Sequence, residues 1–264
     1  MLQITCHQCF ERDLQWTILP FDETSATLWA MYKRVLVKFS GEQLSGKHEF
    51  GIDTDIARYL AHESKKVVDA GCQLALVVGG GNVVRGASLA GHGIKRVTAD
   101  QMGMLSGLMN AMALTDVFEA EGVLTRCMSM IFAEQVAESY SYRRAEKHLE
   151  QRRVLIIAGG IARPYFTHDT AAVSLALELD CNVVIKTTKV DGVYTKDPIE
   201  HPDATMVPKM SYKQAVEDNA IRIMDKAALG LAMEQNMPLV VLDAMRQSNI
   251  LRAVQGKVVG TRIG

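Results

Sequence analysis

The chain contains 264 residues, of which 48% are hydrophobic and 22% are charged, as is typical of a globular protein with a sizeable core. Lys and Arg number 29 against 30 Asp and Glu, so the basic excess of a nucleic-acid-binding protein is absent. No apolar run reaches the roughly 18 residues of a membrane-spanning helix, which argues against a membrane partner. The five Cys are few and odd in number, and we therefore expect a cytoplasmic protein.

Residues 1–30 differ from the rest of the chain because they show no sustained hydrophobic periodicity. They contain Cys6 and Cys9 in a C-x-x-C spacing, but no second pair of zinc ligands follows at a suitable distance. We therefore expect an N-terminal extension here and no zinc site. The ordered pattern begins at Tyr32, so Met31 is an alternative candidate for the natural start.

Beyond this extension, apolar runs alternate with segments of helical periodicity. The runs predict buried strands at residues 34–39, 74–78, 123–127, 154–158, 182–186 and 239–242. The periodic segments predict helices at residues 53–70, 98–121, 141–151, 169–179, 224–235 and 249–254. Continuous apolar strands joined by helices are typical of a parallel sheet that is covered on both faces. We therefore predict an α/β fold, a three-layer α/β/α sandwich with a largely parallel central sheet, formed by a single domain over residues 31–264.

Glycine and polar residues follow four of the predicted strands, at residues 38–42, 79–82, 159–169 and 187–192. The carboxyl ends of parallel strands share one edge of the sheet, where ligands bind. Glycines let the backbone approach a phosphate, and a lysine at a strand end can stabilise a transferring phosphoryl group. Each loop alone is also common as a plain connection between elements. Their convergence on one edge favours a site that handles phosphate groups.

Residues 41–48 come close to the P-loop pattern G-x4-G-K-S/T. His48 stands at the final position, however, where the pattern needs a hydroxyl that binds Mg²⁺, and no helix is expected to open directly after it. No G-x-G-x-x-G follows a predicted strand either. The sequence therefore favours neither a P-loop nucleotide-binding protein nor a dinucleotide-binding protein.

The chain from about Tyr32 to Gly264 resembles the bacterial UMP kinases of the amino-acid-kinase superfamily. The resemblance is carried, in order, by Tyr32–Glu42, Phe50–Asp53, Val78–Gly86, Asp100–Leu105 and Lys186–Pro198. It implies transfer of the γ-phosphoryl group of ATP to UMP, which yields UDP for pyrimidine nucleotide biosynthesis. It also implies a requirement for Mg²⁺ and a homo-oligomer that is usually a hexamer.

The resemblance further implies roles for individual residues, with Lys38 as the main charge stabiliser. The implied catalytic residues are Lys38, Asp169 and Asp225, the two carboxylates serving to orient the lysine or Mg²⁺. The implied ATP contacts are Lys38, Phe39, Ser40, Gly41, Gly81, Arg85, Thr188, Tyr194 and Asp197. The implied UMP contacts are Gly80, Asp100, Ile161, Ala162, Arg163, Pro164, Tyr165, Phe166, Thr167 and His168. No residue is assigned as a dedicated metal ligand.

At three of the implied UMP contacts, a hydroxyl or an amide of the family pattern is replaced. Ile161, Arg163 and His168 stand where the resembling kinases usually have Thr, Asn and Thr. A site that loses hydrogen-bonding groups discriminates less sharply between bases. His168 is in addition a candidate sensor of pH near about 6–7.

Two other functions stay open at this point. One is a related kinase that forms an acyl or carbamoyl phosphate. The other is a non-catalytic member of the fold that binds a nucleotide or an oxyanion.

Overall fold

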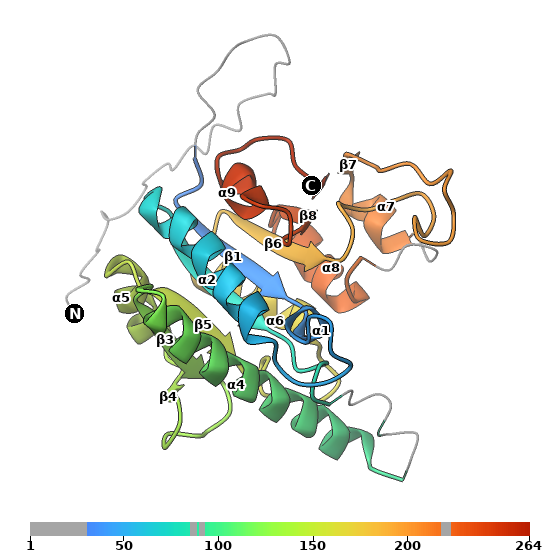
Figure 1. The fold of residues 1–264 in the computed structure, drawn as a ribbon. Helices are drawn as coiled ribbons and strands as arrows, with labels where there is room; N and C mark the ends of the chain where they lie inside the picture. Colours follow the sequence, from blue (N-terminus) through green and yellow to red (C-terminus); the bar gives the residue numbers. More distant parts are fainter. Residues whose placement is uncertain (1–30, 85–88, 90–92, 218–222) are drawn as a thin grey trace, which may run out of the picture.

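The computed structural model describes residues 31–84, 89, 93–217 and 223–264. Within these residues, nine strands form one sheet in the order β4-β3-β5-β2-β1-β6-β8-β9-β7 (Figure 1). The strands are β1 (Arg34–Phe39), β2 (Gln73–Val78), β3 (Thr125–Ser129), β4 (Glu138–Ser139), β5 (Val154–Ala158), β6 (Val183–Thr188), β7 (Lys209–Met210), β8 (Leu239–Asp243) and β9 (Thr261–Ile263). Every neighbouring pair is parallel except β8 and β9, which are antiparallel.

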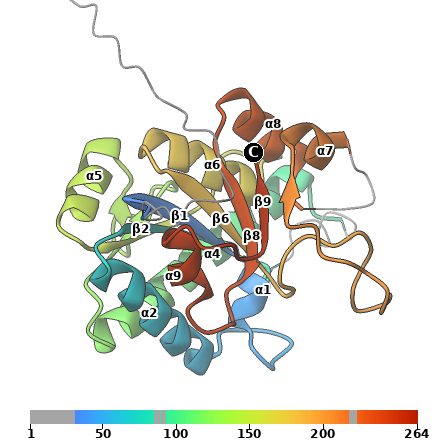
Figure 2. The ribbon, with the colours of Figure 1, turned by 90° about the horizontal axis from the view of Figure 1, so that it is seen from above.

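Helices cover both faces of this sheet (Figure 2). The helices are α1 (Gly41–Leu44), α2 (Thr54–Asp69), α4 (Arg96–Ala120), α5 (Tyr142–Glu150), α6 (His168–Glu178), α7 (Tyr212–Glu217), α8 (Lys226–Glu234) and α9 (Asn249–Val254). Helices α2, α4 and α9 pack on one face, and α5, α6, α7 and α8 pack on the other. The predicted three-layer α/β/α sandwich is confirmed.

Strand side chains alternate between two hydrophobic cores, one on each face of the sheet. In β1, Val35 and Val37 point into the core beneath α2, whereas Leu36 points into the core beneath α6. All three side chains are fully buried. Because a central parallel strand is buried on both faces, it appears in the sequence as a continuous apolar run.

The predicted elements all have counterparts, with small shifts at their ends. The strand expected from residue 123 begins at Thr125, because Gly122, at φ +73°, ends α4 and the N–H of Val123 bonds back to Phe118. The helix expected from residue 224 begins two residues later, because Asp225 is its N-cap. Short elements such as α1, β7 and β9 were not predicted, since two to four residues are too few to show a period.

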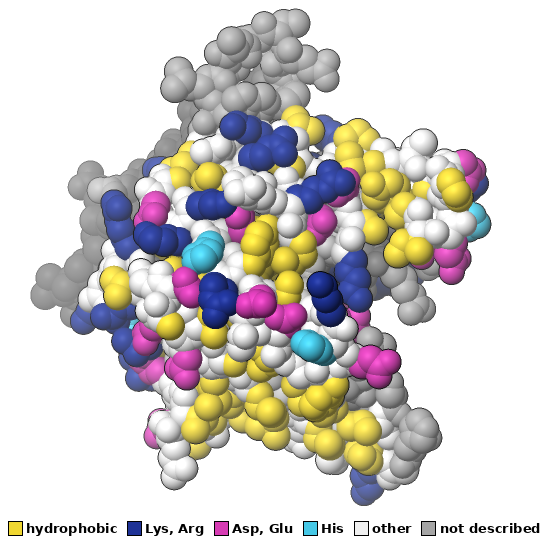
Figure 3. All heavy atoms as spheres, viewed as in Figure 1, with side chains coloured by type: hydrophobic (Ala, Val, Ile, Leu, Met, Phe, Trp, Pro, Cys, Tyr) yellow, Lys and Arg dark blue, Asp and Glu magenta, His cyan; other side chains and the backbone are white. Residues whose placement is uncertain are grey.

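Helix α4 carries an apolar stripe on its outer face. Leu105, Met109 and Met112 lie four and three residues apart, which places them on one side of a helix, and they are 49%, 53% and 36% exposed. Figure 3 shows hydrophobic side chains gathered over this helix. The inner face packs on the sheet through Leu108 and Leu114, so α4 is apolar on two sides.

Several expectations concern parts of the chain outside the described residues. These are the N-terminal extension over residues 1–30, with its C-x-x-C pair, and the implied ATP contact Arg85. Among the helices that the structure does describe, none has the length and apolar character needed to cross a membrane.

Candidate active site

Two lysines at the carboxyl edge of the sheet face the same helix. Lys38 of β1 is in register with Lys186 of β6 across the parallel pair. Leu36 and Val184, two residues earlier on each strand, both point into the core beneath α6. Since side chains two residues apart share a face, both lysines project toward the start of α6.

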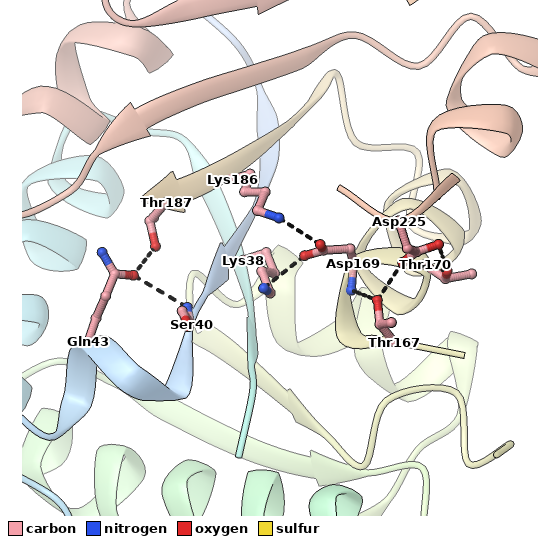
Figure 4. Close-up of polar contacts among 9 residues, drawn as sticks. All are labelled: Lys38, Ser40, Gln43, Thr167, Asp169, Thr170, Lys186, Thr187 and Asp225. Carbon is pink, nitrogen blue, oxygen red and sulfur yellow. Dashed lines mark hydrogen bonds and ion pairs between the residues drawn. The ribbon is translucent and has the colours of Figure 1, made fainter. Parts of the chain in front are cut away.

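A carboxylate at the start of α6 meets both lysines (Figure 4). Asp169 Oδ1 lies 2.8 Å from Lys38 Nζ, and Asp169 Oδ2 accepts a hydrogen bond of 2.6 Å from Lys186 Nζ. The contact with Lys38 is an ion pair without hydrogen-bond geometry. The three side chains are only 11–13% exposed. Two ammonium groups around one carboxylate leave an excess positive charge in a site that is largely shielded from water.

Burial and the neighbouring opposite charges shift the pKa values of Asp169 and Lys186 in opposite directions. Burial alone would raise the pKa of Asp169, but the ammonium groups of Lys38 and Lys186 outweigh it and hold that pKa below its ordinary value. Burial lowers the pKa of Lys186, although Asp169 partly opposes the shift. Asp169 is therefore ionised at neutral pH, and Lys186 releases its proton more readily than a surface lysine.

Asp225 connects α8 to the start of α6. Its Oδ1 accepts hydrogen bonds of 2.9 Å from the N–H of Ala228, as the N-cap of α8, and from Thr170 Oγ1. Its Oδ2 accepts from Thr167 Oγ1 at 2.5 Å. Thr167 Oγ1 in turn accepts from the N–H of Asp169 at 2.9 Å and caps α6. Asp225 thus positions the turn that carries Asp169.

The turn after β1 is stacked tightly on the glycine loop after β2. A Cβ atom on Gly41 would lie 2.5 Å from the carbonyl oxygen of Gly79 and 2.6 Å from the nitrogen of Gly81. A Cβ atom on Gly80 would lie 2.5 Å from the carbonyl oxygen of Gly103 in α4. Only glycine fits at either position, and the backbone is thereby free to approach a ligand.

These residues surround a cavity of about 690 Å³, a volume typical of small-molecule sites. The implied site residues that line it are Lys38, Ser40, Gly41, Gly80, Gly81, Thr167, His168, Asp169 and Asp225. Lys186 lines it too, although sequence reasoning did not assign it a role. The sequence signal for Lys186 is its place at the end of the predicted strand 182–186. This signal becomes informative only once β6 is known to pair with β1.

A second cavity of about 1100 Å³ adjoins the first and shares Gly81 with it. It is lined mainly by residues 42–56, with Lys189, Asp243 and Met245. We place the chemistry in the smaller cavity, because that cavity contains the buried charge cluster.

The remaining implied ATP contacts that the structure describes do not line the smaller cavity. The side chain of Phe39 is 1% exposed and belongs to the core, so only its backbone could reach a nucleotide. Thr188 Oγ1 donates to the carbonyl of Val190. Tyr194 and Asp197 lie on the segment between β6 and β7.

The implied UMP contacts Asp100, Ile161, Ala162, Arg163, Pro164, Tyr165 and Phe166 also lie outside the lining of this cavity. Asp100 joins α4 to the loop after β5. Its Oδ1 accepts from Arg96 Nε at 2.7 Å, and its Oδ2 accepts from the N–H of Tyr165 at 2.8 Å. Both oxygens are thus engaged, and a ribose hydroxyl would have to share or displace one of these bonds.

His168 fits against a glycine of α4. A Cβ atom on Gly107 would lie 3.0 Å from His168 Nε2, and that nitrogen is buried without a hydrogen-bond partner. Burial, assisted by the charge of Lys38, lowers the pKa of His168 to about 4. The imidazole is therefore uncharged at neutral pH, and the expectation that it senses pH near about 6–7 is wrong.

Among the residues that the structure describes, no group of three or more His, Cys, Asp or Glu side chains could hold a metal ion. Asp169 is engaged by two lysines, and Asp225 is engaged by two threonines and a backbone N–H.

Comparison with known proteins identifies the family. Residues 33–243 match the model of the Amino acid kinase family. The chain belongs to this family. The uridylate kinase of Campylobacter fetus subsp. fetus is 46% identical over 225 residues, which are 85% of this chain and 94% of that protein.

Solved structures of named UMP kinases share the fold. The crystal structure of UMP kinase from Bacillus anthracis superposes with a TM-score of 0.85 at 34% identity, covering 89% of this chain and 97% of that one. The crystal structure of UMP kinase from Ureaplasma parvum gives a TM-score of 0.81 at 28% identity, covering 89% and 100% of the two chains. Both the family resemblance and the fold class predicted from the sequence are confirmed.

The buried, uncharged His168 predicts a pH dependence of stability. An unfolded histidine titrates near about 6.5, so between about pH 6.5 and 4 the unfolded chain binds a proton that the folded chain does not. Stability should therefore fall as the pH is lowered through this range. In His168→Asn, the loss of unfolding free energy between pH 7 and 5 should be smaller than in the wild type by about 2 kcal/mol, measured by urea unfolding.

His201→Asn, at an exposed histidine, is the matched control and should keep the wild-type pH dependence. If His168→Asn loses as much stability on acidification as the wild type, His168 does not have the lowered pKa.

Proposed function

We propose that this chain is an ATP-dependent UMP kinase, which transfers the γ-phosphoryl group of ATP to UMP and releases UDP and ADP. The observation that carries this proposal is the buried cluster of Lys38, Asp169 and Lys186 beside the glycine loop. Relatives named for this activity match this chain over most of their length, one in sequence and one in fold. We further propose that the enzyme acts in the cytoplasm, in pyrimidine nucleotide biosynthesis.

The chemistry requires charge stabilisation and alignment more than proton transfer. An oxygen of the UMP phosphate bonds to the γ-phosphorus while the bond from that phosphorus to the β,γ-bridging oxygen breaks, and ADP leaves. The attacking oxygen is already anionic, so no general base is needed. Lys38 and Lys186 stabilise the negative charge on the transferring group, and Asp169 keeps the two ammonium groups in place.

The two nucleotides occupy opposite parts of the cavity edge in this proposal. ATP phosphates contact Lys38, Ser40, Gly41 and Gly81, with Phe39 contributing through its backbone. The nucleoside of ATP extends toward Thr188, Tyr194 and Asp197, and Arg85 also belongs to the ATP side. UMP contacts Gly80, Thr167 and His168, with Asp100 and residues 161–166 nearby. Mg²⁺ enters with ATP, because kinase sites usually hold this ion through the substrate phosphates together with one or two carboxylates.

Neither alternative function gains support. An acyl or carbamoyl phosphate kinase would be expected to have relatives named for such substrates, whereas those reported above are named for uridylate or UMP. A non-catalytic binding protein has no need of two lysines buried against one carboxylate.

Initial rates of ATP consumption with UMP, dUMP, CMP and no acceptor test this function. We expect turnover that depends on UMP, with CMP near the background. Protein that binds ATP but turns over none of these nucleotides would falsify the proposal.

Loss of either lysine should remove transition-state stabilisation. Lys38→Met and Lys186→Met should each lower kcat by at least about 100-fold, the scale reported for removal of one preorganised charge-stabilising group. Lys65→Met, at an exposed lysine on α2, is the control and should retain wild-type kcat. Circular dichroism should show that all three variants are folded. A Lys186→Met enzyme with normal kcat would show that Lys38 acts alone.

We also propose that the chain forms a homo-oligomer, in which a second copy covers the stripe of Leu105, Met109 and Met112 on α4. An exposed apolar stripe on a long helix is costly in water, and a two-fold contact buries it against the same residues of a partner. The resemblance to the UMP kinases implies that six copies assemble.

Charge introduced into the stripe should disrupt this assembly. Light scattering coupled to size exclusion should give a multiple of 29.1 kDa for the wild type and a smaller mass for Met109→Lys. Val258→Lys, at an apolar residue that is 72% exposed outside the stripe, should keep the wild-type mass. A monomeric wild type at micromolar concentration would contradict the proposal.

A further inference from the structure

Gln43 in α1 is a buried polar side chain that makes three hydrogen bonds near the cavity, and Figure 4 shows those with Ser40 and Thr187. It is 7% exposed. Its Oε1 accepts from the N–H of Ser40 at 3.3 Å and from Thr187 Oγ1. Its Nε2 donates to the carbonyl of Thr188 at 3.1 Å. One side chain thus joins the turn after β1 to the last two residues of β6.

This connection begins where the direct pairing of β1 with β6 ends. The register of the two strands extends as far as Lys38 and Lys186. Beyond that pair, Phe39 is in register with β2, and Thr187 and Thr188 are in register with β8. The side chain of Gln43 therefore bridges the two strand ends immediately after the two lysines of the charge cluster.

The turn after β1 is held from its other side as well. Gly41 packs against Gly79 and Gly81 with no room for a side chain. The turn is thus fixed between the glycine loop and Gln43. Loss of the Gln43 amide would leave three buried or half-buried groups without their partner: the N–H of Ser40, the hydroxyl of Thr187 and the carbonyl of Thr188.

We infer that Gln43 is a positioning residue for ATP, which holds the Ser40–Gly41 turn and the Thr188 end of β6 at a fixed separation. The inference rests on the proposed function, in which the turn contacts the ATP phosphates and Thr188 lies on the nucleoside side. Gln43 itself touches neither substrate. A site held within about 0.5 Å of its productive geometry binds without the cost of ordering its loops. Gln43 contributes to the binding of ATP and not of UMP, because all three of its hydrogen bonds are on the ATP side of the proposed site.

Gln43→Met tests the inference, because Met has nearly the same length and shape but cannot make these hydrogen bonds. We expect the Kd of a non-hydrolysable ATP analogue, measured by calorimetry, to rise at least about tenfold, together with the KM for ATP. The KM for UMP should stay within about twofold of the wild type. A general loss of structure would raise both KM values.

Gln73→Met is the matched control. Gln73 opens β2 at the opposite edge of the sheet, where its Oε1 accepts from Arg34 Nε at 2.6 Å. It should leave the Kd of the ATP analogue unchanged. Thr187→Val, which removes only one of the three hydrogen bonds, gives a second test if Gln43→Met does not fold, and its Kd should rise about threefold.

The outcomes separate this inference from the proposed function. Equal binding of the analogue by the wild type, Gln43→Met and Thr187→Val overturns the inference and leaves the UMP kinase activity intact. Equal increases in the KM for ATP and the KM for UMP would show that Gln43 has a purely structural role. A wild type that binds no ATP analogue and shows no turnover with UMP overturns both proposals.

Discussion

The ion-pair cluster around Asp169 is the interaction on which the rest of the site depends. Two lysines brought close together with little water would repel each other and lose hydration, so each needs the carboxylate between them. Asp169 in turn needs the lysines, because burial alone would favour its protonated form. Its place in the first turn of α6 adds the favourable field of the helix N-terminus. Loss of the Asp169 carboxylate would leave two shielded ammonium groups without a counter-ion, whereas loss of one lysine would leave a single ion pair.

The parallel sheet supplies the geometry that this cluster requires. Lys38 and Lys186 come from strands that are neighbours in space but far apart in the chain, and their common register places both ammonium groups at one height. The covering helix α6 then brings its first turn against that edge. Asp225 fixes the turn from α8 through Thr167, so a third segment of the chain determines where Asp169 lies. A cation pair at a sheet edge thus depends on strand order, helix packing and a side-chain cap together.

Sequence patterns were sufficient to predict the fold class. They were also sufficient to single out those site residues that stand next to a recognisable local motif. Buried strands and helices differ in periodicity, and Lys38 and Asp169 each lie beside a loop of recognisable composition, Lys38 near the end of β1 and Asp169 at the start of α6. Lys186 was not assigned a role, because its position depends on the pairing of β1 with β6, and no local pattern encodes strand order. Gln43 did leave a local signal, since Ser40 and Gln43 form an S-x-x-Q capping box at the start of α1. The protonation of His168 depends on its burial against Gly107, a contact over sixty residues away in the chain.

The two sides of the cavity are held by different means, and this explains how the loop after β5 can depart from the family pattern. The proposed ATP side is fixed by close backbone packing and by the amide of Gln43. The loop on the proposed UMP side is anchored through the N–H of Tyr165 to Asp100 and through Thr167 to Asp225. Neither anchor uses the side chain of Ile161 or Arg163. Substitution there can alter what the loop presents to a base without moving Thr167, and therefore without moving the carboxylate that holds the two lysines.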